Sequence, residues 1–505
     1  MTGTPKIAAL LAVLAWTCLA TPPTLAAESY QDWLRSQTQG ARDMDSQYQV
    51  YRSEQDQQFS RHLKAQWQEF QVFQGKVRDP KPKPAVIPVA PVVVKVPPTP
   101  PLVPPELPKK EIAKPADLPI KQTPQPSQPP AKPPAATPDS LEVVFYGNPI
   151  RLPYDPLWRK ARALSRDPKG FAGFWDTLSA SRSQPTLQAI ARTRQEWGLD
   201  DWGHAALWRE VARSLQPDHP AEQQLLLWYF LVKAGVDVRL GYSDQDIHLF
   251  VAVKQPVYSV SYTRVGDRTY YALLSADRGK GLRSFHTYES SYPAPLQPLD
   301  LSGAATAFTR AAPTDKLLTF QHQGRQITVK TGYDRRLVDY LGSFPQLDFE
   351  LYFATQASPA ARSPLLQALR GHLQGLSEED AVNFLLAFVQ KGFAYKTDAD
   401  QFGYEKYFFV EEALHYPYSD CEDRSALFAW LVRELLGLKT VGLHYPGHMT
   451  TGVALLAHAP QKNWTTVEWQ GQRYVIADPT YINASVGMAM PSYAQLQPLR
   501  VIATH

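Results

Sequence analysis

Apolar residues in the C-terminal part of the chain follow the spacings of helices and strands in turn. The run CEDRSALFAWLVRELL (421–436) repeats apolar residues every three to four positions, and Asp420 or Ser419 before it suits an N-cap, which predicts a helix. The runs GHMTTGVAL (447–455) and RYVIADPTY (473–481) are short, apolar and bounded by turn residues, which is typical of buried strands. This alternation predicts an α+β unit.

The same succession of patterns occurs once before in the chain. Each occurrence opens with a strand pair around a glycine, Gly147 or Gly324, and continues with helical runs and an apolar strand. The matched segments are 141–155 with 317–334, 185–202 with 364–380, 221–242 with 421–445, and 247–253 with 447–455. We interpret residues 140–305 and 316–505 as two copies of one α+β unit.

Upstream of the repeats, residues 28–78 are rich in Gln, Arg and Glu, with apolar residues at steps of three and four. That spacing predicts an amphipathic helix whose apolar stripe serves packing or self-association. The stripe comprises Phe59, Leu63, Trp67, Phe70 and Phe73.

Between this segment and the first copy, residues 79–139 hold nearly half of the chain's 45 prolines. Proline fixes φ and removes a backbone donor, so the tract predicts a semi-rigid extended linker and not a domain. A proline-rich ligand for a recognition domain is the alternative interpretation.

The first 27 residues, 1–27, have the features of an export signal. Lys6 precedes the apolar run IAALLAVLAWTCLA, and small residues allow cleavage after Ala26 or Ala27. The apolar run is shorter than the ~20 residues of a membrane span. We therefore expect an exported protein, periplasmic or secreted, that can associate with the cell envelope. An uncleaved anchor and a lipid-modified Cys18 are the alternatives.

Charge and motif content exclude several classes of partner. The net charge of +4 over 505 residues is small and the Lys and Arg residues are dispersed, which argues against a nucleic-acid partner. No Gly-rich phosphate loop or nucleotide fingerprint occurs in the sequence, so no cofactor is expected. His444 and His448 are a weak metal pair without a third ligand nearby, so no metal is expected either.

The chain has two cysteines, and one of them, Cys18, lies in the export signal. Cys421 therefore has no partner for a disulfide within the mature chain, and it is either a buried inert residue or a reactive thiol. The first copy has Ala221 at the matched position. A cysteine is thus not required there for packing alone.

Two further positions bear on the likeness of the copies: a histidine that both copies share and an aspartate that only the second copy has. A histidine follows the cysteine position at the same spacing in both, as His248 in the first copy and His448 in the second. Asp478 of the second copy is matched by Leu273 when both are counted from the preceding turn glycine. The second copy alone thus combines a thiol, an imidazole and a carboxylate.

The segments DCEDRSALFAWLV, GHMTTGVAL and RYVIADPTY resemble the transglutaminase-like superfamily of papain-like α+β folds, most closely over residues 365–490. The resemblance implies that Cys421 is the nucleophile, that His448 is the general base and acid, and that Asp478 orients the imidazole. It also implies that the first copy is a degenerate unit of the same type. One departure is Met449 directly after the histidine, where many members have an aromatic residue.

The position of Cys421 agrees with this chemistry. In the first turn of a helix, unpaired N–H groups and the helix dipole favour a thiolate. The carboxylates of Glu422 and Asp423 oppose it, so we expect an imidazolium from His448 close by. A thiolate that attacks an amide carbonyl forms a thioester. Attack by water then makes the enzyme a peptidase or a deamidase, and attack by an amine makes it a transamidase.

The second copy carries an aromatic insertion directly before the cysteine, FAYKTDADQFGYEKYFFVEEALHYPYSD. We expect it to wall a cleft for a protein or peptide substrate, and the candidate substrate-binding residues are Tyr407, Tyr416 and Tyr418. The alternative class is a non-catalytic cell-envelope binding or assembly protein with a vestigial enzyme head. In that class the N-terminal helix self-associates or docks on an envelope partner.

Overall fold

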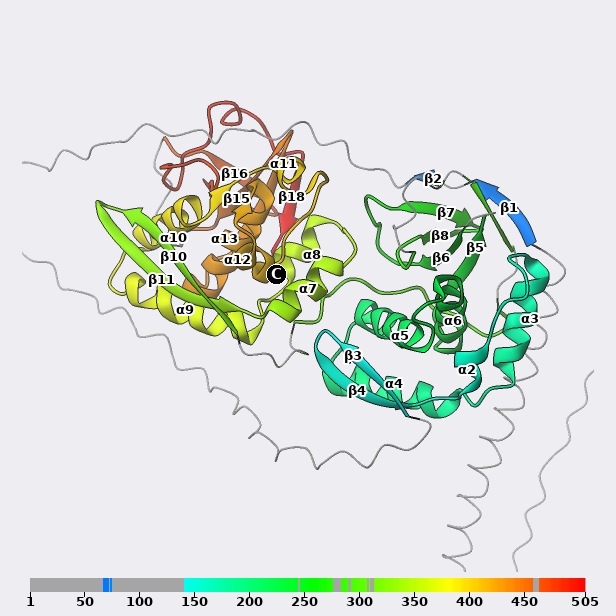
Figure 1. The fold of residues 1–505 in the computed structure, drawn as a ribbon. Helices are drawn as coiled ribbons and strands as arrows, with labels where there is room; N and C mark the ends of the chain where they lie inside the picture. Colours follow the sequence, from blue (N-terminus) through cyan, green and yellow to red (C-terminus); the bar gives the residue numbers. More distant parts are fainter. Residues whose placement is uncertain are drawn as a thin grey trace, which may run out of the picture.

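The computed structural model describes two successive units in which helices pack on a curled antiparallel sheet (Figure 1). The described residues are 140–243, 246–275, 282, 284–288, 292–306, 308, 313–456 and 463–504, together with the backbone of 67–71 and 73–74. The expected export signal (1–27) and the proline-rich tract (79–139) lie outside these ranges. The prediction of a fold that mixes helices and strands is confirmed.

The first unit begins with a hairpin, continues with helices and ends in the sheet. Its elements are β3 (Ser140–Phe145), β4 (Asn148–Pro153), α2 (Leu157–Lys160), α3 (Pro168–Ser179), α4 (Gln184–Trp197), α5 (Asp201–Leu215), α6 (Pro220–Lys233), β5 (Val238–Tyr242), β6 (Ile247–Ala252), β7 (Ser261–Val265), β8 (Arg268–Tyr271) and β9 (Ser284–Tyr288).

The second unit follows the same plan with extra short elements before its central helix. Its elements are β10 (Thr314–His322), β11 (Arg325–Tyr333), α7 (Arg335–Ser343), α8 (Phe349–Ala354), α9 (Pro359–Leu373), α10 (Glu378–Gly392), β12 (Ala394–Tyr395), α11 (Asp398–Phe402), α12 (Val410–His415), β13 (Tyr418–Ser419), α13 (Cys421–Leu436), β14 (Thr440–Tyr445), β15 (His448–Val453), β16 (Thr466–Trp469), β17 (Gln472–Ala477) and β18 (Arg500–Ala503).

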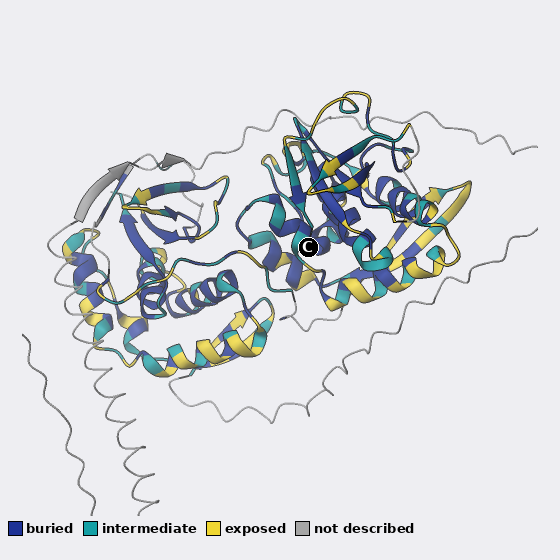
Figure 2. Ribbon diagram, turned by 180° about the vertical axis from the view of Figure 1, so that it is seen from behind, coloured by how far each residue is buried: buried dark blue, intermediate teal, exposed yellow. Residues whose placement is uncertain are grey.

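The two sheets have the same strand order, as the repeat in the sequence suggests. The order β9-β5-β6-β8-β7 in the first unit corresponds to β18-β14-β15-β17-β16 in the second. Each sheet follows a helix that is buried on nearly every side, α6 or α13, and such a helix forms the centre of its unit. Figure 2 shows buried residues concentrated in the helices and sheet of each unit.

The predicted strand pairs at the start of each unit are confirmed as two-residue hairpins. Tyr146 and Gly147 join β3 to β4, and Gln323 and Gly324 join β10 to β11, all with positive φ. This is the turn that matches the right-handed twist of the strands it connects. Glycine at the second position has no Cβ and adopts the left-handed conformation without strain.

Two strands from the N-terminal part of the chain extend the first sheet at both edges. β1 (Trp67–Gln71) pairs with β9, and β2 (Phe73–Gln74) pairs with β7. Because one residue separates β1 from β2, the two edges of this sheet approach each other and the sheet is strongly curled (Figure 1). The helix predicted through Trp67, Phe70 and Phe73 is therefore wrong for these residues, since pairing with the sheet overrides their spacing. The rest of that helix, with Phe59 and Leu63, lies outside the described residues.

Helix α7 joins the second unit to the first. The Tyr340 hydroxyl donates to both carboxylate oxygens of Asp200, at 2.6 and 2.7 Å, and the Trp202 indole N–H donates to Ser343 Oγ at 3.2 Å. Asp200 is also the N-cap of α5, where it accepts from the Gly203 N–H. Burial raises the pKa of Asp200 above its usual value, and these hydrogen bonds offset only part of that shift.

Among the described residues, no helix is both long enough and apolar enough to cross a membrane.

Candidate active site

Cys421 is the first residue of α13, and local interactions fix where that helix begins. Asp420 is the N-cap, and its own backbone N–H donates to Asp423 Oδ2 at 3.2 Å. The Arg424 N–H donates to the Asp420 carbonyl oxygen, which makes the first intrahelical bond. Cys421 thus lies in the first turn, where N–H groups lack helical partners. Its side chain is almost completely buried, with the residue 1% exposed.

His448 and Asp478 meet because of the sheet register. His448 opens β15 and pairs with Tyr445 across a tight turn, and the pair Thr451 and Ala477 aligns β15 with β17. Asp478 directly follows β17 and therefore lies beside the start of β15. His448 Nε2 donates to Asp478 Oδ2 at 2.9 Å, and both residues are 2% exposed.

The loop after β17 holds the Asp478 carboxylate in place. Its Oδ1 accepts from the backbone N–H groups of Thr480 and Tyr481, at 2.9 and 3.2 Å. The buried Gln390 side chain on α10 donates to the carbonyl oxygens of Asp478 and Ala484, both at 3.0 Å. One carboxylate oxygen is thereby kept for the backbone and the other for His448.

The bond to Asp478 determines which nitrogen of His448 can act as a base. Donation from Nε2 to a carboxylate assigns the ring proton of a neutral imidazole to Nε2. Nδ1 is then the unprotonated nitrogen, and it is buried without a hydrogen-bond partner. The imidazole therefore has one basic atom available for a proton from a neighbouring group.

Contacts between α13 and β15 bring the thiol turn to this imidazole. Ser425, one turn along the helix from Cys421, donates its hydroxyl to the Met449 carbonyl oxygen at 3.1 Å. Met449 is the residue after His448, and its side chain belongs to the same buried apolar cluster as Cys421 and Phe349. The structure thus brings the three residues of the predicted triad to one place in the second unit.

The Cys421 thiol has a carboxylate neighbour. Cys421 Sγ lies 3.1 Å from Glu422 Oε2, where a protonated thiol donates a hydrogen bond to the carboxylate and a thiolate would be repelled by it. The sequence predicted that Glu422 opposes a thiolate, and this contact is the physical form of that opposition. Nucleophilic attack requires that the proton leave for His448, because the thiolate is the reactive species.

Tyr493 is a site residue that the sequence did not reveal. Its ring stacks on the His448 ring with centroids 4.9 Å apart and planes at 25°. Burial raises the pKa of Tyr493, and the electrostatic effect of the neighbouring Cys421 and Asp478 raises it further, so the phenol stays protonated. It comes from a C-terminal loop without helical or strand periodicity, and no sequence signal would have identified it.

The three predicted substrate-binding tyrosines occupy different surroundings. Tyr407 packs on Phe349, with ring centroids 4.6 Å apart, at the edge of the apolar cluster that contains Cys421. Tyr416 instead stacks on Phe408, at 4.9 Å. Tyr418 is exposed, with the Lys396 ammonium 5.4 Å from its ring centre. Of the three, Tyr407 is the one that the structure brings toward the triad.

A buried ion pair stabilises the aromatic insertion. The Lys406 ammonium bonds to Glu412 Oε1, and it lies 5.2 Å from the ring centre of Phe408 and 5.4 Å from that of Tyr416. Burial alone would lower the pKa of Lys406, but Glu412 more than offsets this and the pKa is raised. The tyrosine at 416 thus takes part in holding the insertion together.

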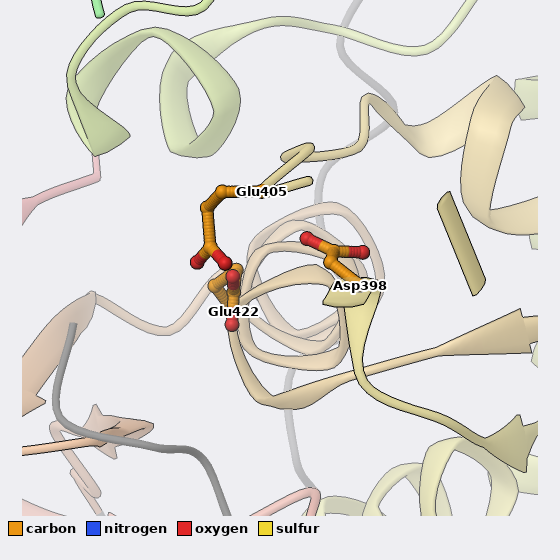
Figure 3. A group of neighbouring side chains, drawn as sticks. All are labelled: Asp398, Glu405 and Glu422. Carbon is orange, nitrogen blue, oxygen red and sulfur yellow. The ribbon is translucent and has the colours of Figure 1, made fainter. Parts of the chain in front are cut away.

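Acidic side chains gather where this insertion meets the first turn of α13. Figure 3 shows Glu405, Glu422 and Asp398, and one oxygen from each lies within 4.8 Å of the others. A second group with the same property consists of Asp398, Asp420 and Asp423. The sequence singled out Glu422 and Asp423 but not Asp398 or Glu405.

Backbone hydrogen bonds give these carboxylates a structural role. Asp398 Oδ2 accepts from the Lys406 N–H at 2.8 Å, and Asp423 Oδ1 accepts from the Phe408 N–H at 2.9 Å. The insertion is thereby tied to the start of the cysteine helix. Carboxylate oxygens are also the ligands that calcium and magnesium prefer, so these are the described residues that could hold a metal ion. The absence of a metal site stays a prediction.

The first unit lacks the triad at the equivalent positions. Ala221 lies at the start of α6 and the buried His248 lies at the start of β6. In the sheet register Val251 pairs with Tyr271 as Thr451 pairs with Ala477, so the residue that corresponds to Asp478 is Ala272. The sequence prediction that Leu273 corresponds to Asp478 is therefore wrong by one residue, because counting from the turn glycine does not reproduce the pairing of the strands. Neither residue is acidic.

No protein-family model, curated protein or solved structure matches this chain.

Proposed function

We propose that the chain is an exported thiol enzyme of the transglutaminase-like type, with a papain-like catalytic unit at 316–505 and a degenerate copy at 140–305. It forms a thioester from amide groups of protein or peptide substrates. The observation that carries the proposal is the buried hydrogen bond from His448 Nε2 to Asp478, which leaves Nδ1 free as a base next to the helix turn of Cys421.

The proposed mechanism uses only side chains and backbone of this chain. His448 Nδ1 accepts the thiol proton of Cys421, and the sulfur attacks the carbonyl carbon of the amide. The backbone N–H of Cys421, at the start of a helix, stabilises the negative charge that develops on the carbonyl oxygen. The imidazolium then gives its proton to the leaving nitrogen, the C–N bond breaks, and a thioester remains.

The second half of the reaction determines the class of enzyme. His448 accepts a proton from the incoming nucleophile, and the C–S bond breaks as the thiol is restored. Water as nucleophile gives peptidase or deamidase activity, and a primary amine gives transamidase activity. All three share the same triad, so the geometry supports the class and the experiment below separates its members.

Export and partners complete the proposal. The features of residues 1–27 support export to the periplasm or the exterior, and the expected partners are protein or peptide substrates without nucleic acid or cofactor. Self-association or docking on a cell-envelope partner through the N-terminal residues stays a prediction.

One observation favours the non-catalytic alternative. Cys421 is buried, and its thiol donates to Glu422, an arrangement that also suits an inert thiol in a vestigial head. In that case the chain is a cell-envelope binding or assembly protein.

A single set of reactions separates these candidates. The full chain and two variants, Cys421→Ser and His448→Ala, are incubated with a protein mixture and a labelled primary amine, followed by mass spectrometry. Amine incorporation identifies a transamidase, new chain termini a peptidase, and conversion of glutamine to glutamate a deamidase. Each activity must disappear in both variants. A wild-type protein that produces none of these changes would contradict the enzyme and favour the binding protein.

A further inference from the structure

A cavity of about 440 Å³ lies in the first unit, at the place that corresponds to the triad of the second. Its wall includes Ala221 from the start of α6, Ile247 from the start of β6, and Ser275 from the segment after β8. In the second unit the matching elements are α13, β15 and β17, which carry or precede the triad residues. The volume is within the ~300–1,000 Å³ of typical ligand pockets.

The wall of this cavity, which we call the Ala221 cavity, carries an excess of positive charge. Three arginines line it, Arg166, Arg209 and Arg213, whereas Asp246 is the one acidic residue among its described lining residues. A further carboxylate, Glu210, lies 3.2 Å from Arg213 and 3.8 Å from Arg209. Guanidinium groups gathered in a concave site attract carboxylate or phosphate ligands.

Two polar atoms of the wall residues make no hydrogen bond within the described part of the chain. Arg209 Nε is a buried donor whose ion-pair partner, Glu210 Oε1, is 3.8 Å away and too far for a hydrogen bond, and Gln224 Oε1 is a buried acceptor without a donor. The start of α6 is also uncapped, since the His219 side chain makes no hydrogen bond to the first turn. Buried polar atoms without partners cost free energy, so a ligand that supplies both an anionic acceptor and an N–H donor would be stabilised here.

We propose that the Ala221 cavity binds a peptide with acidic side chains. Carboxylates of the peptide pair with Arg166, Arg209 and Arg213. A peptide N–H donates to Gln224 Oε1. Inorganic phosphate would satisfy the arginines but offers no N–H for the glutamine. This binding uses no group of the triad and does not depend on whether Cys421 is a nucleophile.

Binding is tested with the full chain carrying Cys421→Ala, so that the probe is not turned over. The probe is a fluorescein-labelled tetraglutamate peptide, followed by fluorescence anisotropy. We expect saturable binding that weakens at least about tenfold with Arg209→Gln and Arg213→Gln combined, because charge-assisted hydrogen bonds are lost. The matched control is Arg192→Gln, which changes an exposed arginine of α4 outside the cavity and leaves the affinity unchanged.

A second variant guards against loss of folding. Ala221→Glu adds a carboxylate inside the cavity at a helix start, where acidic residues are tolerated, and we expect it to abolish binding. Absence of binding by the Cys421→Ala parent, or unchanged affinity in Ala221→Glu, would overturn the proposal. Unlabelled tetraglutamate should compete and tetraglutamine should not. Phosphate that competes as well as tetraglutamate would overturn the peptide assignment in favour of a phosphate site.

The test is independent of the proposed enzyme activity. In an otherwise wild-type chain, the Ala221→Glu variant should be alkylated at Cys421 by iodoacetamide as fast as the wild type, because the substitution lies in the other unit. Loss of peptide binding by Ala221→Glu with alkylation unchanged supports the cavity. Failure of the parent to bind the peptide refutes the cavity alone and leaves the triad untouched.

Discussion

Replacing Asp478 with asparagine tests whether the buried pair activates Cys421. Asparagine has the shape of aspartate, so its Oδ1 can keep the backbone N–H groups of Thr480 and Tyr481. Its amide N–H then faces His448 Nε2, where a carboxylate oxygen now accepts at 2.9 Å. A donor at that position requires an unprotonated Nε2, so the ring proton moves to Nδ1. The base that should accept the thiol proton is thereby lost.

The size of the effect follows from the fraction of thiolate. Without an imidazolium partner, Cys421 ionises no more than an ordinary thiol, and at pH 6.5 about 1% of a thiol with a pKa of about 8.5 is ionised. The Glu422 carboxylate, 3.1 Å from the sulfur, reduces that fraction further. Since thiolate is the form that reacts, the rate of alkylation should fall by roughly 100-fold or more relative to a fully ionised pair.

The assay is alkylation of the full chain by iodoacetamide at pH 6.5, followed by mass spectrometry of the peptide that contains Cys421. The matched control is Asp339→Asn, which changes an exposed carboxylate of α7 that pairs with Arg335. In Asp478→Asn the rate should recover only as the pH rises above about 8.5, because an unassisted thiol ionises near that pH and the Glu422 carboxylate opposes its ionisation. Equal rates in the wild type and Asp478→Asn would refute the reasoning, and so would an equal loss in Asp339→Asn.

Substitutions at three further residues test access to the thiol, packing around Arg424 and the pH dependence of stability. Tyr493→Ala removes the ring that stacks on His448 and should raise the rate of Cys421 alkylation severalfold. Tyr493→Phe keeps the ring and should keep the wild-type rate. An unchanged rate in the alanine variant would show that this ring does not shield the thiol. Arg424→Met leaves two buried carbonyl oxygens without their donor and should lower the free energy of unfolding in urea by about 3 kcal/mol, so a loss under about 1 kcal/mol would contradict that role. Burial and the nearby Arg194 guanidinium lower the pKa of His204 to about 4. As the pH falls from about 6.5 to about 4, the unfolded chain therefore binds a proton that the folded chain does not bind. Stability from this group is present above about pH 6.5, and up to about 3 kcal/mol is lost across that window. His204→Gln should remove that part of the pH dependence in urea titrations at pH 7 and 4.5, and an unchanged pH dependence would count against it.

The parts of the site that the sequence predicted depend on local order along the chain. The helix at Cys421 follows from Asp420 as N-cap and from apolar spacing, and both are confirmed. The two-residue hairpins follow from glycine at the turn. His448 and Asp478 could be proposed because the first stands at the start of a short apolar run and the second at the end of the next, and the sheet register then brings them together.

Residues that act through distant contacts could not be predicted. Gln390 supports the Asp478 loop from 88 positions earlier in the chain, and Asp398 approaches the cysteine helix from an insertion. Their residue types are common on helices and in loops, and only the folded chain assigns their partners. The spacing of Trp67 and Phe70 fitted a helix, but hydrogen bonding to β9 decided their conformation.

The strands at the two edges of the first sheet change what the proline-rich residues 79–139 can do. The chain leaves β2 at Gln74 and re-enters the same unit at Ser140, so both ends of the intervening segment are fastened to one body. The distance between these two attachment points is therefore set by the first unit and not by the number of residues between them. Doubling or halving the length of this segment would therefore not alter the reach of the residues before Trp67, and for a flexible segment it would alter the free energy of loop closure by only about 0.6 kcal/mol.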